Sequence, residues 1–75
     1  MSDVTAKLGK VIRQLRTDRG ISQEGLAALS GIDRTFMGEI ERGMANPSFD
    51  VLQRIAGGLG VRLSELVRRY ESETD

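Results

Sequence analysis

The chain has 75 residues, which is the length of one small domain. Hydrophobic residues make up 39% and charged residues 29%, a mixture typical of a folded globular protein rather than a disordered one. The sequence contains no cysteine and no histidine, so disulfides, thiolate or imidazole metal sites and an imidazole base are excluded. We therefore expect no metal, no cofactor and no catalytic residue.

The first predicted helix covers about residues 5–19. Its apolar residues recur at helical spacing and form one stripe, made of Leu8, Val11, Ile12 and Leu15. Either Thr5 or Asp3 can cap its start, and Gly20 can supply the left-handed residue that ends it.

Two short helices follow. Ser22 and Asp33 are the predicted N-caps of the second and third helices, which end at Gly31 and Gly43. The second helix carries Leu26, Ala27 and Leu29. The third carries Phe36, Met37 and Ile40.

Two further helices complete the predicted domain. Residues 44–47 form a loop, after which Ser48 caps the fourth helix, and Ser64 caps the fifth, over about residues 64–71. Glycines weaken the end of the fourth helix: Gly57, Gly58 and Gly60. The apolar residues that these two helices carry are Val51, Leu52, Ile55, Ala56, Leu59, Leu63, Leu66, Val67 and Tyr70.

The stretch from Ser22 to Gly43 carries the functional signal. Two helices of about eight residues meet there across a short turn that contains Gly31, which is the layout of a helix-turn-helix. Small Ala27 lets the two helices approach closely. Because Met37 and Ile40 are expected to be buried, the outward face of the third helix consists of Arg34, Thr35, Gly38 and Glu39. This face is polar and narrow, as a helix that enters a major groove must be.

The charge of the chain gives a mixed indication. Lys and Arg total 11, as do Asp and Glu, and a neutral chain does not by itself favour nucleic acid. The charges are nevertheless uneven: residues 5–19 are basic, whereas residues 71–75 form an acidic tail with Glu71, Glu73 and Asp75. A basic binding face and a merely solvated helix with a frayed tail are both compatible with this pattern. No apolar run approaches the roughly 20 residues of a membrane helix, and the N-terminus lacks the layout of a signal peptide, so we expect a cytoplasmic protein.

The joint spacing of several short motifs resembles the lambda-repressor-like helix-turn-helix family, also called the XRE or Cro/C1 type. The motifs are Ile12-Arg13-Gln14-Leu15-Arg16, Arg19-Gly20-Ile21-Ser22-Gln23-Glu24, Leu26-Ala27, Gly31, Ile40-Glu41-Arg42-Gly43 and Asn46-Pro47-Ser48. The resemblance covers about Leu8 to Leu66 and implies an all-α, five-helix DNA-binding domain. Within the family, Asp33-Arg34-Thr35-Phe36 and the short length look like the controller proteins of restriction–modification systems, which are homodimeric regulators of their own operon. Prophage repressors and antitoxins of the same fold share these features.

The resemblance implies roles for individual residues. Arg34, Thr35, Gly38 and Glu39 would lie against base edges, where Arg suits guanine O6 and N7. Backbone contacts would come from Ser22, Gln23, Arg42, Gly43 and Asn46. The 44–47 loop departs from the family, because Met44 and Ala45 stand where many relatives have Lys or Arg. Arg16 and Glu41 would form a structural ion pair.

The fifth helix carries more apolar surface than it needs to seal the domain, and we expect it to pair two chains. Leu66 is the core residue, so the predicted dimer interface consists of Leu63, Val67 and Tyr70. The expected function is a sequence-specific, double-stranded-DNA-binding transcriptional regulator that acts as a homodimer on a palindromic operator, without a small-molecule ligand or a membrane. The alternative is an antitoxin-like protein-interaction module of the same fold, which the zero net charge and the weakly basic loop favour.

Overall fold

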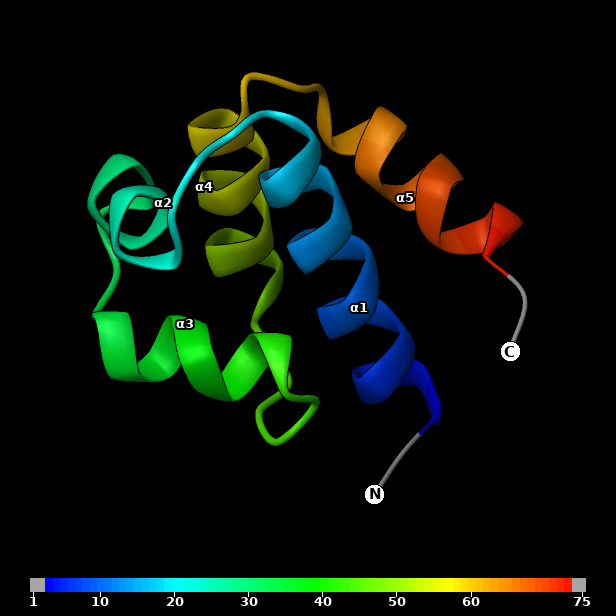
Figure 1. Cartoon of the computed structure of the whole chain (residues 1–75). Helices are drawn as coiled ribbons and strands as arrows, with labels where there is room; N and C mark the ends of the chain where they lie inside the picture. The colour runs from blue at the N-terminus through cyan, green and yellow to red at the C-terminus, as the bar shows by residue number, and fades with distance from the viewer. Residues whose placement is uncertain (1–2, 74–75) are drawn as a thin grey trace.

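The computed structural model describes residues 3–73, which form five α-helices and no strand (Figure 1). The helices are α1 (Asp3–Asp18), α2 (Gln23–Ser30), α3 (Arg34–Glu41), α4 (Phe49–Leu59) and α5 (Leu63–Ser72). The all-α prediction with five helices is confirmed, and each boundary falls within two residues of its expected position. Helices α1 and α4 fill the middle of the view and run in roughly the same direction, with α2 on one side and α5 on the other.

Local side-chain chemistry explains where three of these helices begin. Ser22 Oγ accepts from the N–H of Gly25 at 2.9 Å, and Ser48 Oγ accepts from the N–H of Val51 at 3.2 Å. Asp33 Oδ2 accepts from the N–H of Thr35 at 3.0 Å. Each contact satisfies a backbone donor that the first turn of a helix leaves without a partner, so these three predicted caps are confirmed.

The predicted caps of the first and fifth helices do not match the structure. Helix α1 begins at Asp3, so of the two candidate caps Thr5 lies inside the helix and Asp3 is its first residue. Helix α5 begins at Leu63, so Ser64 is its second residue and Arg62 occupies the N-cap. The reason is that Glu65 supplies the polar contact at this end: its Oε1 accepts from the N–H of Arg62 at 3.2 Å.

The glycines of α4 also differ from their predicted role. Gly57 and Gly58 lie inside the helix, which continues to Leu59 and ends at left-handed Gly60, with φ 75°. A methyl group at Gly58 would lie 2.6 Å from Ser30 Oγ of α2. Gly58 therefore permits close packing of α4 on α2 rather than weakening the helix end.

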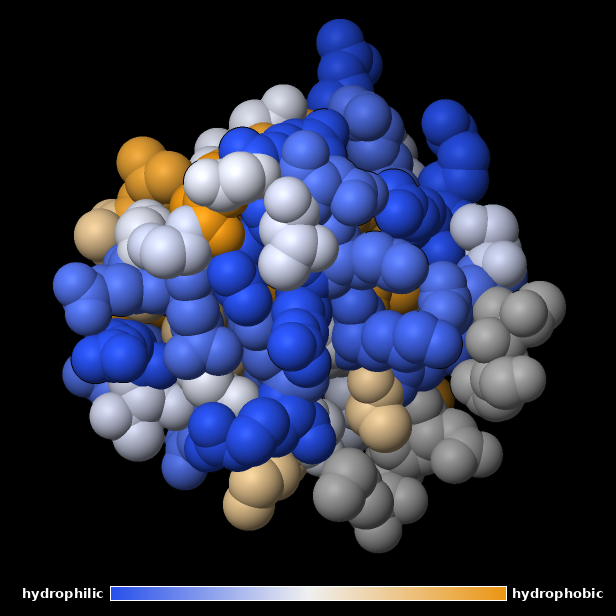
Figure 2. All heavy atoms as spheres, viewed as in Figure 1, coloured by the Kyte–Doolittle hydropathy of each residue, from blue (hydrophilic) through white to orange (hydrophobic). Residues whose placement is uncertain are grey.

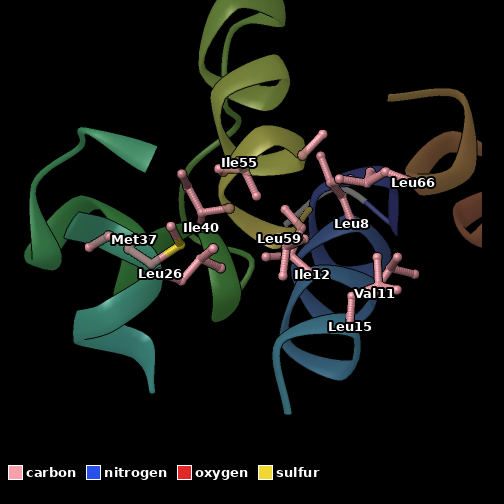
Figure 3. Close-up of a cluster of buried hydrophobic side chains, with 12 residues drawn as sticks. Leu8, Val11, Ile12, Leu15, Leu26, Met37, Ile40, Ile55, Leu59 and Leu66 are labelled. Carbon is pink, nitrogen blue, oxygen red and sulfur yellow. The ribbon is translucent and has the colours of Figure 1, made fainter. Parts of the chain in front are cut away.

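The core draws on all five helices. It consists of Leu8, Val11, Ile12, Leu15, Leu26, Ala27, Met37, Ile40, Ile55, Ala56, Leu59 and Leu66. Figure 3 shows Leu26 and Met37 together on one side of the cluster and Leu66 of α5 beside Leu8 of α1 on the other. Leu29 does not join this cluster, because its side chain is exposed.

Helix α3 is fixed to α1 by direct backbone packing. A Cβ atom at Gly9 of α1 would lie 2.3 Å from the carbonyl oxygen of Ile40 and 2.7 Å from that of Glu41. After α3, left-handed Gly43 lies against α1 in the same way, since its Cβ would lie 2.8 Å from Ala6 Cα. The end of α3 is thus seated at two points on α1.

Part of the predicted acidic tail belongs to the folded domain. Glu71 lies in α5, and Glu73 forms an ion pair with Lys10 of α1 at 2.8 Å. The hydrogen bond from Lys10 and its charge hold the pKa of Glu73 below its usual range. Asp75 lies outside the described residues. Among residues 3–73, no helix combines the length and hydrophobicity that crossing a bilayer requires.

Candidate nucleic-acid interface

The first turn of α3 presents its polar residues to solvent. Arg34 and Thr35 are exposed, whereas Met37 and Ile40 are fully buried and Phe36 packs partly against the core. In Figure 2 the surface over α3 is largely hydrophilic, while a hydrophobic patch lies over α2. The structure therefore separates the two faces of α3 as the sequence predicts for these residues.

Two residues expected on the outward face of α3 are less accessible than predicted. Gly38 is buried, because the side chains of Arg42 and Gln23 cover it; its Cβ would lie 3.1 Å from Arg42 Nη1 and 3.4 Å from Gln23 Oε1. Glu39 is half-buried. Gly38 instead forms the floor of a shallow polar hollow of about 250 Å³, whose lining residues are Gln23, Arg34, Thr35, Gly38 and Arg42.

The start of α2 meets α3 at this hollow. Ser22 is exposed, and its hydroxyl caps α2 while its own proton stays available for a donor contact. Gln23 is half-buried, and its Nε2 donates to Glu41 Oε1 at 3.2 Å. This bond fixes the side-chain amide of Gln23 beside Gly38. Sequence spacing does not predict this hydrogen bond, since its two partners lie 18 positions apart.

The residues after α3 divide into exposed and buried ones. Arg42 and Asn46 are exposed. Gly43, expected as a backbone contact for DNA, is buried against Ala6, and its N–H donates to the carbonyl of Ile40 at 3.0 Å. Its N–H donor is therefore occupied within the protein, which disfavours the predicted backbone contact with DNA at Gly43.

Arg16 and Glu41 form the ion pair that the sequence predicts. Arg16 Nε lies 2.8 Å from Glu41 Oε2, and Arg16 Nη2 lies 3.0 Å from Oε1, so the two side chains meet as a bidentate pair. The side chain of Glu41 is only 3% exposed. Arg16 Nη1 also donates to the carbonyl of Ile21 at 2.9 Å, which ties the turn before α2 to the same cluster.

A second basic residue of α1 lies at this end of the molecule. Arg13 is exposed and lines a small polar hollow of about 130 Å³ together with Arg16, Gln23, Glu41 and Arg42. The basic charge of residues 5–19 left a binding face and a solvated helix equally open, and it did not single out Arg13. The available signal was the spacing of Arg13 and Arg16, which puts both residues on neighbouring positions of one helix face.

The three residues predicted for dimerisation lie on α5. Val67 is 41% exposed, and Leu63 and Tyr70 are partly buried. Val67 and Tyr70 line an apolar groove of about 240 Å³ whose other lining residues are Val4, Leu8, Leu52 and Leu66. Leu63 packs against the core beside it. Among the described residues, no group of three or more acidic side chains is placed to hold a metal ion.

Comparison with known proteins gives a consistent result. The helix-turn-helix family model matches residues 12–66. Control protein C.MunI from a Mycoplasma species is 39% identical over 74 residues, which cover 97% of this chain and 100% of the relative. The crystal structure of restriction-modification controller protein C.AhdI from Aeromonas hydrophila has a TM-score of 0.80 at 44% identity and covers 83% of this chain and 94% of its own. Wild-type C.Esp1396I, another such controller protein, has a TM-score of 0.85 at 32% identity over the whole of both chains.

The fold and the paired helices α2 and α3 define a helix-turn-helix protein, and the chain belongs to that family. More closely, it is a transcriptional regulator of the restriction–modification controller type. Its relatives are regulators and control proteins rather than enzymes.

Proposed function

We propose that this protein is a homodimeric regulator that binds double-stranded DNA in a sequence-specific way through α3. The observation that carries the proposal is the exposed pair Arg34 and Thr35 at the start of a helix whose other end is fixed by Arg16 and Glu41. A rigidly seated helix with polar residues in its first turn is the element that reads base edges in the major groove.

Each side chain at the interface has a chemistry suited to DNA. Arg34 can donate two parallel hydrogen bonds to guanine O6 and N7, and Thr35 can contact a thymine methyl group or a phosphate. Four further side chains can donate hydrogen bonds to DNA phosphates: those of Ser22, Gln23, Arg42 and Asn46. Arg13 joins this set, because it shares a hollow with Gln23 and Arg42. It offsets the lack of basic residues at Met44 and Ala45.

Dimerisation would use the groove beside α5. A nearly apolar groove with exposed Val67 at its edge is surface that a second copy can cover. A two-fold pairing would place two copies of α3 about 34 Å apart, one helical turn of DNA, and so favours a palindromic operator. Binding that depends on dimerisation responds to the protein's own concentration. We therefore infer autoregulation of a small restriction–modification operon in the cytoplasm. The similarity to proteins named control proteins and restriction-modification controller proteins supports this inference.

A gel-shift titration with the DNA upstream of the protein's own gene tests this function. We expect one discrete complex at concentrations that leave unrelated DNA of equal length unbound. Equal binding to both DNAs, or to neither, would contradict the proposal. Failure to bind either DNA would favour the protein-interaction module instead.

A further inference from the structure

An ion pair links the first turns of the two helices of the helix-turn-helix. Arg34 Nη1 of α3 lies 3.3 Å from Glu24 Oε2 of α2. Both side chains are exposed, at 68% and 73% respectively, so the pair lies at the surface. Arg34 is also a wall of the hollow above Gly38. The residue that we propose reads a base is thus held by a carboxylate on the neighbouring helix.

We propose that Glu24 determines specificity by positioning Arg34, an inference that rests on the proposed function of Arg34. A guanidinium group has five N–H donors in one plane, and the ion pair with Glu24 is made through Nη1. The remaining edge stays available for guanine O6 and N7. Glu24 therefore restricts the orientations of a long side chain while leaving its base-reading donors unoccupied.

Glu24 also acts against binding to DNA of the wrong sequence. On such DNA no guanine receives Arg34, and the favourable alternative for a free guanidinium is a phosphate. The pair with Glu24 competes with that phosphate, and the carboxylate itself repels the DNA backbone. On the operator, the contact of Arg34 with the base compensates for the missing phosphate contact and for the repulsion from the carboxylate of Glu24. The net result is a larger ratio of operator affinity to random-DNA affinity.

The test is to replace Glu24 with Gln, which removes the charge and keeps the shape. Asp50→Asn is a matched control. Asp50 is likewise the second residue of a helix that a serine caps, and it forms an exposed ion pair with Arg54 at 3.4 Å. Both variants change the net charge equally. Affinities for an operator duplex and a scrambled duplex of the same length are measured by fluorescence anisotropy at several salt concentrations.

We expect Glu24→Gln to lower the ratio of operator to scrambled affinity by about 2- to 25-fold in a dimer, since each of the two exposed pairs changes affinity by about 1.4- to 5-fold. Binding to scrambled DNA should also become more salt-dependent. Asp50→Asn should leave the ratio unchanged. In an Arg34→Ala background, Glu24→Gln should have no effect on the ratio.

Three results would overturn the inference. The ratio stays constant in Glu24→Gln, or it falls equally in Asp50→Asn, or it still falls when Arg34 is absent. If the wild-type protein fails to distinguish operator from scrambled DNA, the proposed function itself is wrong. If the wild-type protein distinguishes them and Glu24→Gln does so equally well, only the role of Glu24 is wrong.

Discussion

Glu41 lies where three parts of the chain meet. Its carboxylate accepts two hydrogen bonds from Arg16 and one from Gln23, and Arg16 extends the cluster to the carbonyl of Ile21. The sequence motif predicted the pair with Arg16, because the family pattern places both residues. The contact with Gln23 depends on how α2 crosses α3 and was not predictable from spacing.

Replacing Glu41 with Ala should destabilise the fold strongly. The change leaves Arg16, whose side chain is only 12% exposed, without its counter-charge. Stranding one partner of a buried pair costs about 3–5 kcal/mol, and each kcal/mol lowers the Tm of a domain of this size by about 4–8 °C. Calorimetry should therefore show a Tm lower by more than about 10 °C. Asp50→Ala, which removes an exposed ion pair, is the control, and an equal shift in both variants would refute the structural role.

Replacing Arg34 with Ala should abolish sequence preference without changing the fold. Arg34 is exposed, so its loss creates no cavity, while a lost bidentate base contact costs about 1–3 kcal/mol in each subunit. Circular dichroism should be unchanged, and the affinity for operator DNA should approach that for random DNA. Equal weakening on both DNAs would instead identify Arg34 as a phosphate contact.

At the scale of the elements, helix starts and ends were predictable where the cause is local. Ser22, Asp33 and Ser48 cap their helices through bonds that span two or three residues, and left-handed Gly31 follows α2 as expected. Ser64 was assigned wrongly because Glu65 competes for the same end of the helix.

Burial between elements was harder to predict. Gly38 and Gly43 look accessible in a helical projection, yet the side chain of Arg42 covers the first and α1 covers the second. Gly9 carried no signal beyond being a glycine inside a helix. Such contacts depend on the crossing of elements that are distant in the sequence, which periodicity does not report.

The seat of α3 on α1 makes a prediction about glycines. Gly9→Ala should lower the free energy of unfolding by about 1–3 kcal/mol, which is the usual cost of overpacking a core. The reason is that the new methyl group would meet the backbone of Ile40 and Glu41. Gly57→Ala is the control, since nothing lies within 4 Å of its Cβ. That variant should gain about 0.5–1 kcal/mol from helix propensity. Chemical denaturation distinguishes the two, and similar stabilities would show that α1 and α3 do not pack so closely.

At the scale of the whole molecule, polar contacts join α5 and the residue that follows it to α1. Arg69 pairs with Asp18 at 3.3 Å, Lys10 with Glu73, and the ammonium of Lys7 lies 4.6 Å from the centre of the Tyr70 ring. Helix α5 also lines the apolar groove that includes Val67. The sequence indicated the surplus apolar surface of α5 but not the groove, because Val4 and Leu52 come from other helices.

Replacing Val67 with Asp should separate the dimer into folded monomers. The side chain is 41% exposed in one chain, so a carboxylate there is tolerated in the monomer but becomes costly when a second copy covers it. Sedimentation at micromolar concentration should show a monomer with unchanged helix content. A variant that remains dimeric would exclude the α5 surface as the interface.

In-vitro selection of bound sequences from random double-stranded DNA tests the central claim most directly, because it reports specificity, spacing and symmetry together. A dimer that inserts two copies of α3 should enrich sequences with two-fold symmetry whose half-sites are about 10 base pairs apart, centre to centre. Each half-site should contain a guanine that the Arg34→Ala variant no longer requires. Recovery of sequences without any preference, or of a preference that lacks two-fold symmetry, would contradict the account.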